Sequence, residues 1–184
     1  GREIVLLVKD PSRVFFTTDH PNGAPFTSYP ELFRLLMDYE FRLQKIQSIN
    51  KDSLDFSYLK DLKRTYSMYE IAIMTRASPA EILGLKDRGS LKEGCLADIS
   101  IYDPKKTIDK MFREASYVFK DGDEVVRNGK VLKHKKTTTQ CIKTTYEKSI
   151  LKEVDKWIRG YYSLDLDQFR VDQEFFNVNN FKSH

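Results

Sequence analysis

The chain has 184 residues, 40% of them hydrophobic and 32% charged, and its formal net charge at pH 7 is +4. This length allows one or two domains with a sizeable core, and the composition excludes a wholly disordered chain. The small positive excess is spread along the sequence and gives no argument for nucleic-acid binding. The dense basic run at residues 133–136 is interpreted as a solvated strand end or turn rather than a phosphate site.

The cysteines and the hydrophobic runs exclude further classes of protein. Cys95 and Cys141 lie far apart and form no metal-binding spacing. We therefore interpret them as buried, reduced thiols and exclude iron–sulfur ligation by this chain. No apolar run approaches the ~20 residues of a membrane span, and no segment resembles a signal peptide. We expect a cytoplasmic protein that binds no membrane, and we attribute the start at Gly1 to processing or truncation.

The first elements are two short apolar runs at residues 4–8 and 14–16, separated by a polar turn at Asp10 and Pro11. Runs that are apolar on both faces suit strands that are covered on both sides, as in α/β folds. The pattern therefore suits strands, but five residues do not distinguish a strand from a helix by pattern alone.

Helical patterns follow. Residues 30–48 carry one apolar stripe at three- and four-residue intervals, with Pro30 at the first helical position, and residues 50–60 are predicted to be a polar connection. A capping box at residues 67–70 predicts the start of a second helix. Ser78 is predicted to be the N-cap of a short third helix that ends near Gly84.

After Asp87 the pattern becomes that of an antiparallel β unit. Residues 97–102 alternate as a half-buried strand does. Asp-Gly at 121–122 and Asn-Gly at 128–129 then predict consecutive hairpins, because these dipeptides tolerate the positive φ that tight hairpin turns require.

The end of the chain is predicted to be a helix followed by an irregular segment. Residues 147–162 have one apolar stripe, and residues 163–184 are rich in aromatic side chains. We expect this aromatic segment to dock on its own chain or on a partner.

The candidate functional residues follow the second apolar run, in the sequence Thr-Thr-Asp-His-Pro-Asn-Gly at residues 17–23. Asp19 would lie where a parallel barrel strand delivers catalytic groups to the barrel mouth. There it could ligate a metal or move a proton to and from a metal-bound water. On the residue alone, an N-cap or turn role is favoured. His20 suits a hydrogen-bonding neighbour or packed loop residue better than a metal ligand, and Asn22 either binds substrate or forms a turn.

A second informative segment is Asp-Arg-Gly-Ser-Leu-Lys-Glu-Gly-Cys-Leu-Ala-Asp-Ile at residues 87–99. It has the composition of a tight turn and a glycine-bearing bend that lead into a strand. We expect Asp98 to be structural, with its carboxylate bonded to backbone N–H groups of a turn.

These two segments, with capped helices between them, resemble the amidohydrolase superfamily. There, Gly-Ser-Leu-x-x-Gly-x-x-Ala-Asp-Ile marks the return of the chain from the barrel to a small β-sandwich. The run around Asp19 and the segments at residues 69–80 and 117–122 further resemble the A subunit of formylmethanofuran dehydrogenases and of related formyltransferase/hydrolase complexes. The resemblance extends from about residue 3 to residue 132, and more loosely into the final helix.

The resemblance implies a fold of class α/β plus β. The last strands and helices of a TIM-type amidohydrolase barrel would occupy residues 1–86, a small antiparallel β-sandwich portion residues 87–145, and a C-terminal helix with its aromatic-rich tail residues 146–184.

The resemblance also implies a chemistry. Such subunits carry a binuclear zinc site and couple formate to the amine of methanofuran, or hydrolyse formylmethanofuran, in CO2 fixation or methanogenesis. Tungsten or molybdenum pterin and iron–sulfur clusters belong to other subunits of the complex. Only Asp19 matches a catalytic position, that of the metal-binding acid that also shuttles a proton. His20 and Asn22 would bind substrate or support the site.

The other metal ligands of the family are missing from this sequence. The chain contains only three histidines, and the family's histidine pair, bridging lysine and later histidine belong to earlier barrel strands. Catalytic zinc usually has three protein ligands. We therefore expect the chain to be inactive without the missing barrel half. Two alternatives remain: a non-catalytic assembly module of a split or degenerate subunit, or another cyclic-amide amidohydrolase, such as a hydantoinase-like or dihydroorotase-like enzyme.

Overall fold

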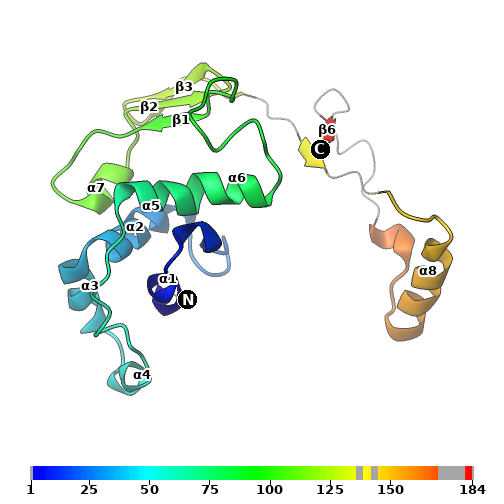
Figure 1. Cartoon of the computed structure of the whole chain (residues 1–184), viewed down its shortest axis with the longest axis horizontal. Helices are drawn as coiled ribbons and strands as arrows, with labels where there is room; N and C mark the ends of the chain where they lie inside the picture. The colour runs from blue at the N-terminus through cyan, green and yellow to red at the C-terminus, as the bar shows by residue number, and fades with distance from the viewer. Residues whose placement is uncertain (1, 136–138, 142–144, 170–180, 184) are drawn as a thin grey trace. The chain divides into compact units, whose positions relative to one another are not determined.

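A computed structural model describes residues 2–135, 139–141, 145–169 and 181–183 (Figure 1). The chain divides into two compact units, Gly1–Lys135 and Lys136–His184. The division of the sequence at residues 86 and 145 stays a prediction.

The first apolar run, at residues 4–8, is a helix rather than the strand that its pattern suited but did not require. Helix α1 spans Arg2–Leu7, and the Val8 N–H continues its pattern by donating to the Ile4 carbonyl at 3.1 Å. A short apolar run can be buried equally well as one turn of helix, which satisfies its backbone groups without a neighbouring strand. A 3₁₀ turn, η1 (Pro11–Arg13), follows, with the Asp10 carboxylate accepting the Ser12 N–H.

The second apolar run is not a strand either. Val14 has extended backbone angles, but the described strands pair only as β1-β2-β3-β4 and β5-β6, so no described strand pairs with residues 14–16. Extended backbone becomes a strand only when a neighbour supplies the hydrogen-bond ladder. The described residues therefore contain none of the parallel barrel strands that the sequence predicted.

The helix predicted over residues 30–48 is two helices, α2 (Tyr29–Met37) and α3 (Tyr39–Ile46). Asp38 between them has extended angles, and its carboxylate accepts the Phe41 N–H at 2.9 Å as the N-cap of α3. An aspartate that can satisfy a new helix start competes with continuation of the old helix. The predicted polar connection also contains a short helix, α4 (Lys51–Asp55).

The capping box at Ser67 and Glu70 is confirmed and begins α5 (Met68–Ala72). Ser78 is not an N-cap, because α5 continues through a π-helical turn, η3 (Ile73–Ala77), directly into α6 (Ser78–Ile82). Pro79 cannot donate to the carbonyl four residues earlier, which is that of Thr75. That carbonyl accepts the Arg76 Nη1 at 2.9 Å instead. Gly84, at φ +70°, lies just after the end of α6, as predicted.

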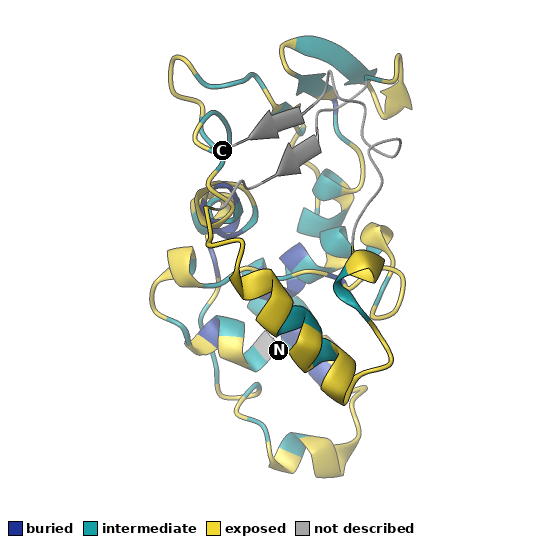
Figure 2. Ribbon diagram, turned by 90° about the vertical axis from the view of Figure 1, so that its right-hand side faces the viewer, coloured by how far each residue is buried: buried dark blue, intermediate teal, exposed yellow. Residues whose placement is uncertain are grey.

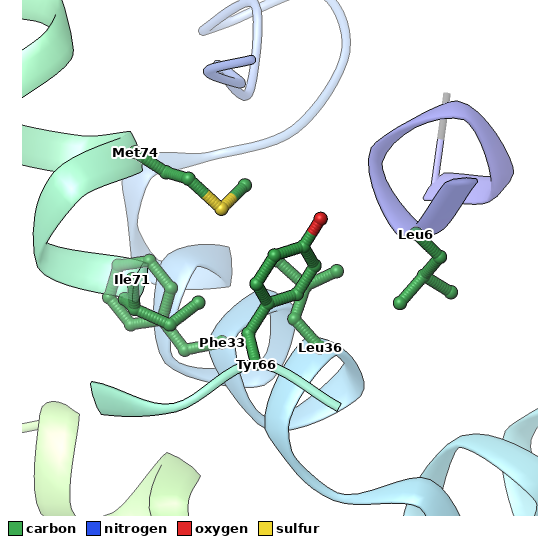
Figure 3. Close-up of a cluster of buried hydrophobic side chains, with 6 residues drawn as sticks. All are labelled: Leu6, Phe33, Leu36, Tyr66, Ile71 and Met74. Carbon is green, nitrogen blue, oxygen red and sulfur yellow. The ribbon is translucent and has the colours of Figure 1, made fainter. Parts of the chain in front are cut away.

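Most of the buried residues, which are dark blue on the ribbon of Figure 2, belong to helices α1 to α6 or to the segments that join them. Figure 3 shows the central cluster, in which residues from α1, α2, α5 and η3 surround a tyrosine that precedes α5; its members are Leu6, Phe33, Leu36, Tyr66, Ile71 and Met74. The Tyr66 hydroxyl donates to the Val5 carbonyl, and its N–H donates to the Leu36 carbonyl at 3.0 Å. Burying an apolar side chain of this size contributes about 1.5–3 kcal/mol, so this cluster fixes the helices of the first unit against one another.

The β unit is an antiparallel sheet in the order β1-β2-β3-β4. Its strands are β1 (Ile99–Ile101), β2 (Tyr117–Lys120), β3 (Asp123–Arg127) and β4 (Lys130–Val131), and α7 (Ile108–Phe112) lies between β1 and β2 in sequence. Both predicted hairpins are confirmed. Asp121 and Gly122 have φ of 49° and 81°, and Asn128 and Gly129 have φ of 47° and 70°.

The second unit contains β5 (Thr139–Cys141), α8 (Ile150–Tyr161), η4 (Leu166–Phe169) and β6 (Phe181–Ser183), with β5 and β6 parallel. The predicted final helix is confirmed, although its apolar stripe is not buried by described residues, and most of α8 is yellow in Figure 2. Phe175 and Phe176 of the aromatic segment lie outside the described residues.

The structure bears on two further expectations, the burial of the cysteines and the absence of a membrane span. Cys95 is a free thiol, but it is half-buried rather than buried as predicted. None of the described helices combines the length and the apolar character that crossing a membrane requires.

Candidate functional site

The candidate residues lie on a tight loop. The Ala24 N–H donates to the Thr18 carbonyl and the Gly23 N–H donates to the Asp19 carbonyl, both at 2.8 Å. A Cβ on Gly23 would lie 2.6 Å from the Thr18 carbonyl oxygen, so only glycine fits at this close approach. The loop thus presents the side chains of residues 19–22 on a backbone held by two hydrogen bonds.

Asp19 has a conformation that is uncommon for a side chain with a Cβ. Its φ is 51°, in the left-handed region, and its side chain is exposed. Its N–H donates to the Thr17 Oγ1 at 3.3 Å, which helps to hold this geometry. Left-handed non-glycine residues recur at functional sites, where surrounding structure maintains the strain. The exposed carboxylate is therefore accessible to a ligand.

His20 and Asn22 are exposed on the same loop. The His20 ring stacks on Phe26, with ring centroids 4.2 Å apart and planes inclined by 24°. The peptide bond between His20 and Pro21 is cis. The loop therefore brings the three predicted site residues together, and their roles stay predictions.

A complete metal site is not formed by the described residues. No three histidine, cysteine, aspartate or glutamate side chains in the part of the chain that the structure describes lie close enough to hold a metal ion. Asp19 alone does not fit the three protein ligands that catalytic zinc usually has. The residues present therefore do not account for the binuclear zinc centre that the family resemblance implies.

Asp98 has the structural role predicted for it. Its carboxylate accepts the Asp121 N–H at 2.9 Å and the Lys120 Nζ at 2.6 Å. Partial burial opposes its ionisation, but the hydrogen bonds from Lys120 and Asp121 and the charges of Lys120 and Arg88 outweigh that effect and hold the pKa of Asp98 below its usual value. The motif at residues 87–99 thus ties the start of β1 to the turn between β2 and β3.

Sequence reasoning missed a hollow of about 740 Å³ beside the loop. Phe15 and Phe16 precede the loop, Phe26 and Thr27 follow it, and all four line the hollow. Residues of η3 line it as well. The clustering of phenylalanines on both sides of the Asp19 loop was visible in the sequence, but the π-helical turn that completes the wall had no recognisable signal.

Comparison with known families identifies residues 3–132 as a match to the amidohydrolase family. This chain belongs to the amidohydrolase family. That membership agrees with the two motifs at residues 17–23 and 87–99, although the described residues show the antiparallel sheet and helices without the parallel barrel.

Two curated relatives show which members of the amidohydrolase family this chain is similar to. The chain is 38% identical, over 97% of its length, to the A subunit of the formyltransferase/hydrolase complex Fhc of Methylorubrum extorquens. It is also 38% identical, over 90% of its length, to Protein FwdA of Methanocaldococcus jannaschii. The resemblance to the A subunit of formylmethanofuran dehydrogenase is thereby confirmed. The chain spans about a third of these relatives, 33% of the first and 31% of the second.

A solved structure gives the same result. The crystal structure of the formyltransferase/hydrolase complex FhcABCD from Methylorubrum extorquens, in complex with methylofuran, contains a chain to which this one is similar with a TM-score of 0.83 and 36% identity. The match covers 100% of this chain and 34% of that chain.

Proposed function

We propose that this chain is part of a subunit that forms or cleaves the C–N bond of a formamide, joining formate to the amine of a furan-bearing carrier such as methanofuran. The observation that supports this most strongly is the 38% identity, over nearly the whole chain, to the A subunit of a formyltransferase/hydrolase complex. The solved relative belongs to a complex that binds methylofuran. The other subunits of such a complex are accordingly proposed as partners, and a cytoplasmic location is proposed with them.

Asp19 is proposed as the catalytic carboxylate that this chain supplies. It is exposed, is held in a left-handed conformation and lies on a loop closed by two backbone hydrogen bonds. A solvent-accessible carboxylate on a backbone held in this way can accept a proton from a water or an amine and return it to a leaving group. His20 and Asn22, on the same loop, are proposed to contact substrate or to support Asp19.

The metal ligands must then come from residues outside this chain. Family resemblance implies zinc, but Asp19 is one carboxylate and the described residues form no cluster of three ligands. We therefore propose that the remaining ligands come from the complementary part of the barrel, and that tungsten or molybdenum pterin and iron–sulfur clusters belong to other subunits.

The incomplete ligand set also favours a second candidate, a non-catalytic assembly module. Under this hypothesis the chain would contribute its sheet and helices to a multi-subunit complex without taking part in the reaction. The third interpretation, a cyclic-amide hydrolase, gains no support from the two relatives or from the solved complex.

The decisive experiment uses the native complex that contains this sequence. Asp19→Asn keeps the size of the side chain and removes its charge. We expect it to abolish formyl transfer or release from formylmethanofuran while the complex still assembles on size-exclusion chromatography. Asp10→Asn, an exposed acid of the neighbouring turn, is the matched control and should retain activity. Full turnover in Asp19→Asn would refute the catalytic role and favour the assembly module.

A further inference from the structure

The basic run at residues 133–136 follows the last strand of the antiparallel sheet, and two of its lysines bind one carboxylate. Lys133 Nζ lies 3.0 Å from one carboxylate oxygen of Asp123, and Lys135 Nζ lies 2.7 Å from the other. Asp123 is the first residue of β3 and precedes the two lysines by 10 and 12 positions. Residues 132–135 thus form a strap that its lysines fasten to the β2–β3 hairpin.

Lys135 is held at several points. Its Nζ also donates to the carbonyls of Lys120 at 3.1 Å and Asp121 at 3.4 Å, and it lies 3.7 Å from the Asp121 carboxylate. The Lys135 side chain is 26% exposed, against 50% for that of Lys133. An ammonium group has three donors and no acceptor, which suits a position surrounded by oxygen atoms. Lys135 therefore attaches the strap to the end of β2, to the turn and to the start of β3.

The charges around the strap continue into a network. Asp121 and Lys120 lie 3.5 Å apart, and Lys120 binds Asp98 at 2.6 Å. Arg88 lies 3.6 Å from the same Asp98 carboxylate. An isolated ion pair at a surface contributes little to stability, but several charges in a network contribute more. Hydrogen bonds and charge from the two strap lysines lower the pKa of Asp123 to about 2, as expected for a carboxylate kept ionised between them.

The backbone of the strap has few contacts of its own. The Leu132 N–H donates to the Val125 carbonyl at 2.9 Å and continues the pairing of β3 with β4. Beyond it, the backbone of residues 133–135 makes no hydrogen bond with another described residue. The side chains of Leu132 and His134 are exposed, so burial of apolar surface adds little. The ion pairs are therefore the main attachment of the strap.

We propose that the strap is a salt-sensitive closure, held on the hairpin at low ionic strength by the two lysines on Asp123 and released when salt screens them. The Debye length falls from about 10 Å at 0.1 M salt to about 3 Å at 1 M, and partly exposed pairs are screened accordingly. Segments with few buried contacts open locally at low cost in free energy. Because the first unit ends at Lys135, release would add the strap to the connection that leads to the second unit.

Limited trypsin digestion of the full 184-residue chain measures the release. Trypsin must take a lysine side chain from its partner before it cleaves, so cleavage after Lys133 and Lys135 reports the open strap. When opening is fast relative to cleavage, the cleavage rate follows the open population. We expect about three- to fivefold faster cleavage in 1 M than in 0.05 M NaCl. Cleavage after Lys51 of α4 is the internal reference for the effect of salt on trypsin itself.

Variants identify the carboxylate that holds the strap. Asp123→Asn keeps both cleavage sites and removes the charge that binds both lysines, so cleavage should already be fast in 0.05 M NaCl and change little with added salt. Glu124→Gln is the matched control, because Glu124 is the next residue of β3 and pairs with Arg127 at 2.6 Å. It should keep the parent rates. Lys135→Gln should accelerate cleavage after Lys133.

Hydrogen exchange of the Leu132 amide, followed by NMR, distinguishes opening of the strap from release of the lysine side chains alone. We expect this exchange to accelerate with salt and in Asp123→Asn, because the opened strap loses the hydrogen bond to the Val125 carbonyl. Three results would overturn the proposal: cleavage rates that do not depend on salt, an Asp123→Asn variant that behaves as Glu124→Gln does, or Leu132 exchange that is the same in every condition. Each would show that the strap stays on the sheet without its ion pairs.

Discussion

The carboxylate of Asp98 accepts the backbone N–H of Asp121 at 2.9 Å, although the two residues are 23 positions apart. This contact explains why an Ala-Asp-Ile sequence follows the glycine-bearing bend. One carboxylate satisfies the backbone of the β2–β3 turn and pairs with Lys120 at 2.6 Å, so the first strand and the following hairpin are held in one register.

Replacing Asp98 by asparagine should destabilise the sheet. The variant keeps an acceptor for the Asp121 N–H but loses the charge opposite Lys120 and Arg88. We expect a loss of about 1 kcal/mol in the free energy of unfolding, typical of a charge-assisted hydrogen bond replaced by a neutral one. Urea unfolding followed by far-UV circular dichroism measures it. Asp61→Asn, in the exposed segment before α5, is the control, and an equal loss in both variants would contradict the argument.

Stability should decrease in acid because several carboxylates have lowered pKa values. Hydrogen bonds and charge from Lys135 and Lys133 lower the pKa of Asp123 to about 2, and the pKa of Asp98 is also lowered. A carboxyl whose folded pKa lies below its unfolded value stabilises the fold fully above the unfolded pKa, and this contribution is lost as the pH falls through the folded pKa. The urea concentration at the midpoint of unfolding should therefore decrease as the pH is lowered from about 4 towards 2, given an unfolded aspartate pKa of about 3.9.

The combined variant Asp98→Asn/Asp123→Asn tests the cause of that acid sensitivity. It should flatten the dependence of the urea midpoint on pH between about 4 and 2, since two groups that release protons on folding have been removed. A slope unchanged from the parent chain would show that other carboxylates account for the loss.

Arg42 is expected to be the most sensitive polar residue of the first unit. It is 3% exposed, and its guanidinium donates to the carbonyls of Leu35, Leu62 and Arg64 at 2.7–2.9 Å. Burial lowers its pKa. Arg42→Met would remove the donor from the buried carbonyl of Leu35 and from the half-buried carbonyls of Leu62 and Arg64, and a buried group left unsatisfied costs about 1–3 kcal/mol. Urea unfolding should show a loss of at least ~2 kcal/mol, whereas Arg13→Met at an exposed turn should show little change.

The sequence predicted the parts of the fold that local chemistry determines. Ser67 with Glu70, and the two hairpin dipeptides, specify their structures through their own backbone and side-chain groups, and the structure contains all of them. Elements that depend on neighbours were predicted less well. Residues 4–8 could form a strand or a helix until a partner strand was known, and Asp38 ended a helix whose apolar stripe continues beyond it.

The candidate site shows the same difference. The loop at residues 17–23 was recognisable from its sequence, because glycine, proline and asparagine in a short run indicate tight turns. The hollow beside it was not recognisable, because it needs α7, which is distant in sequence, and a π turn at Ile73–Ala77 that no periodicity indicated.

Gly23 should be indispensable to the Asp19 loop. Alanine there would place a Cβ 2.6 Å from the Thr18 carbonyl, and that backbone atom cannot move without breaking the hydrogen bond to Ala24. We expect Gly23→Ala to destabilise the first unit by about 1–3 kcal/mol. Gly160→Ala is the opposite case, because nothing lies within 4 Å of the position that its Cβ would take in α8 and alanine favours a helix by about 0.5–1 kcal/mol. Urea unfolding followed by far-UV circular dichroism should show a lower midpoint for Gly23→Ala and a higher midpoint for Gly160→Ala. An unchanged midpoint in Gly23→Ala would mean that the loop is not held as closely as its two hydrogen bonds indicate.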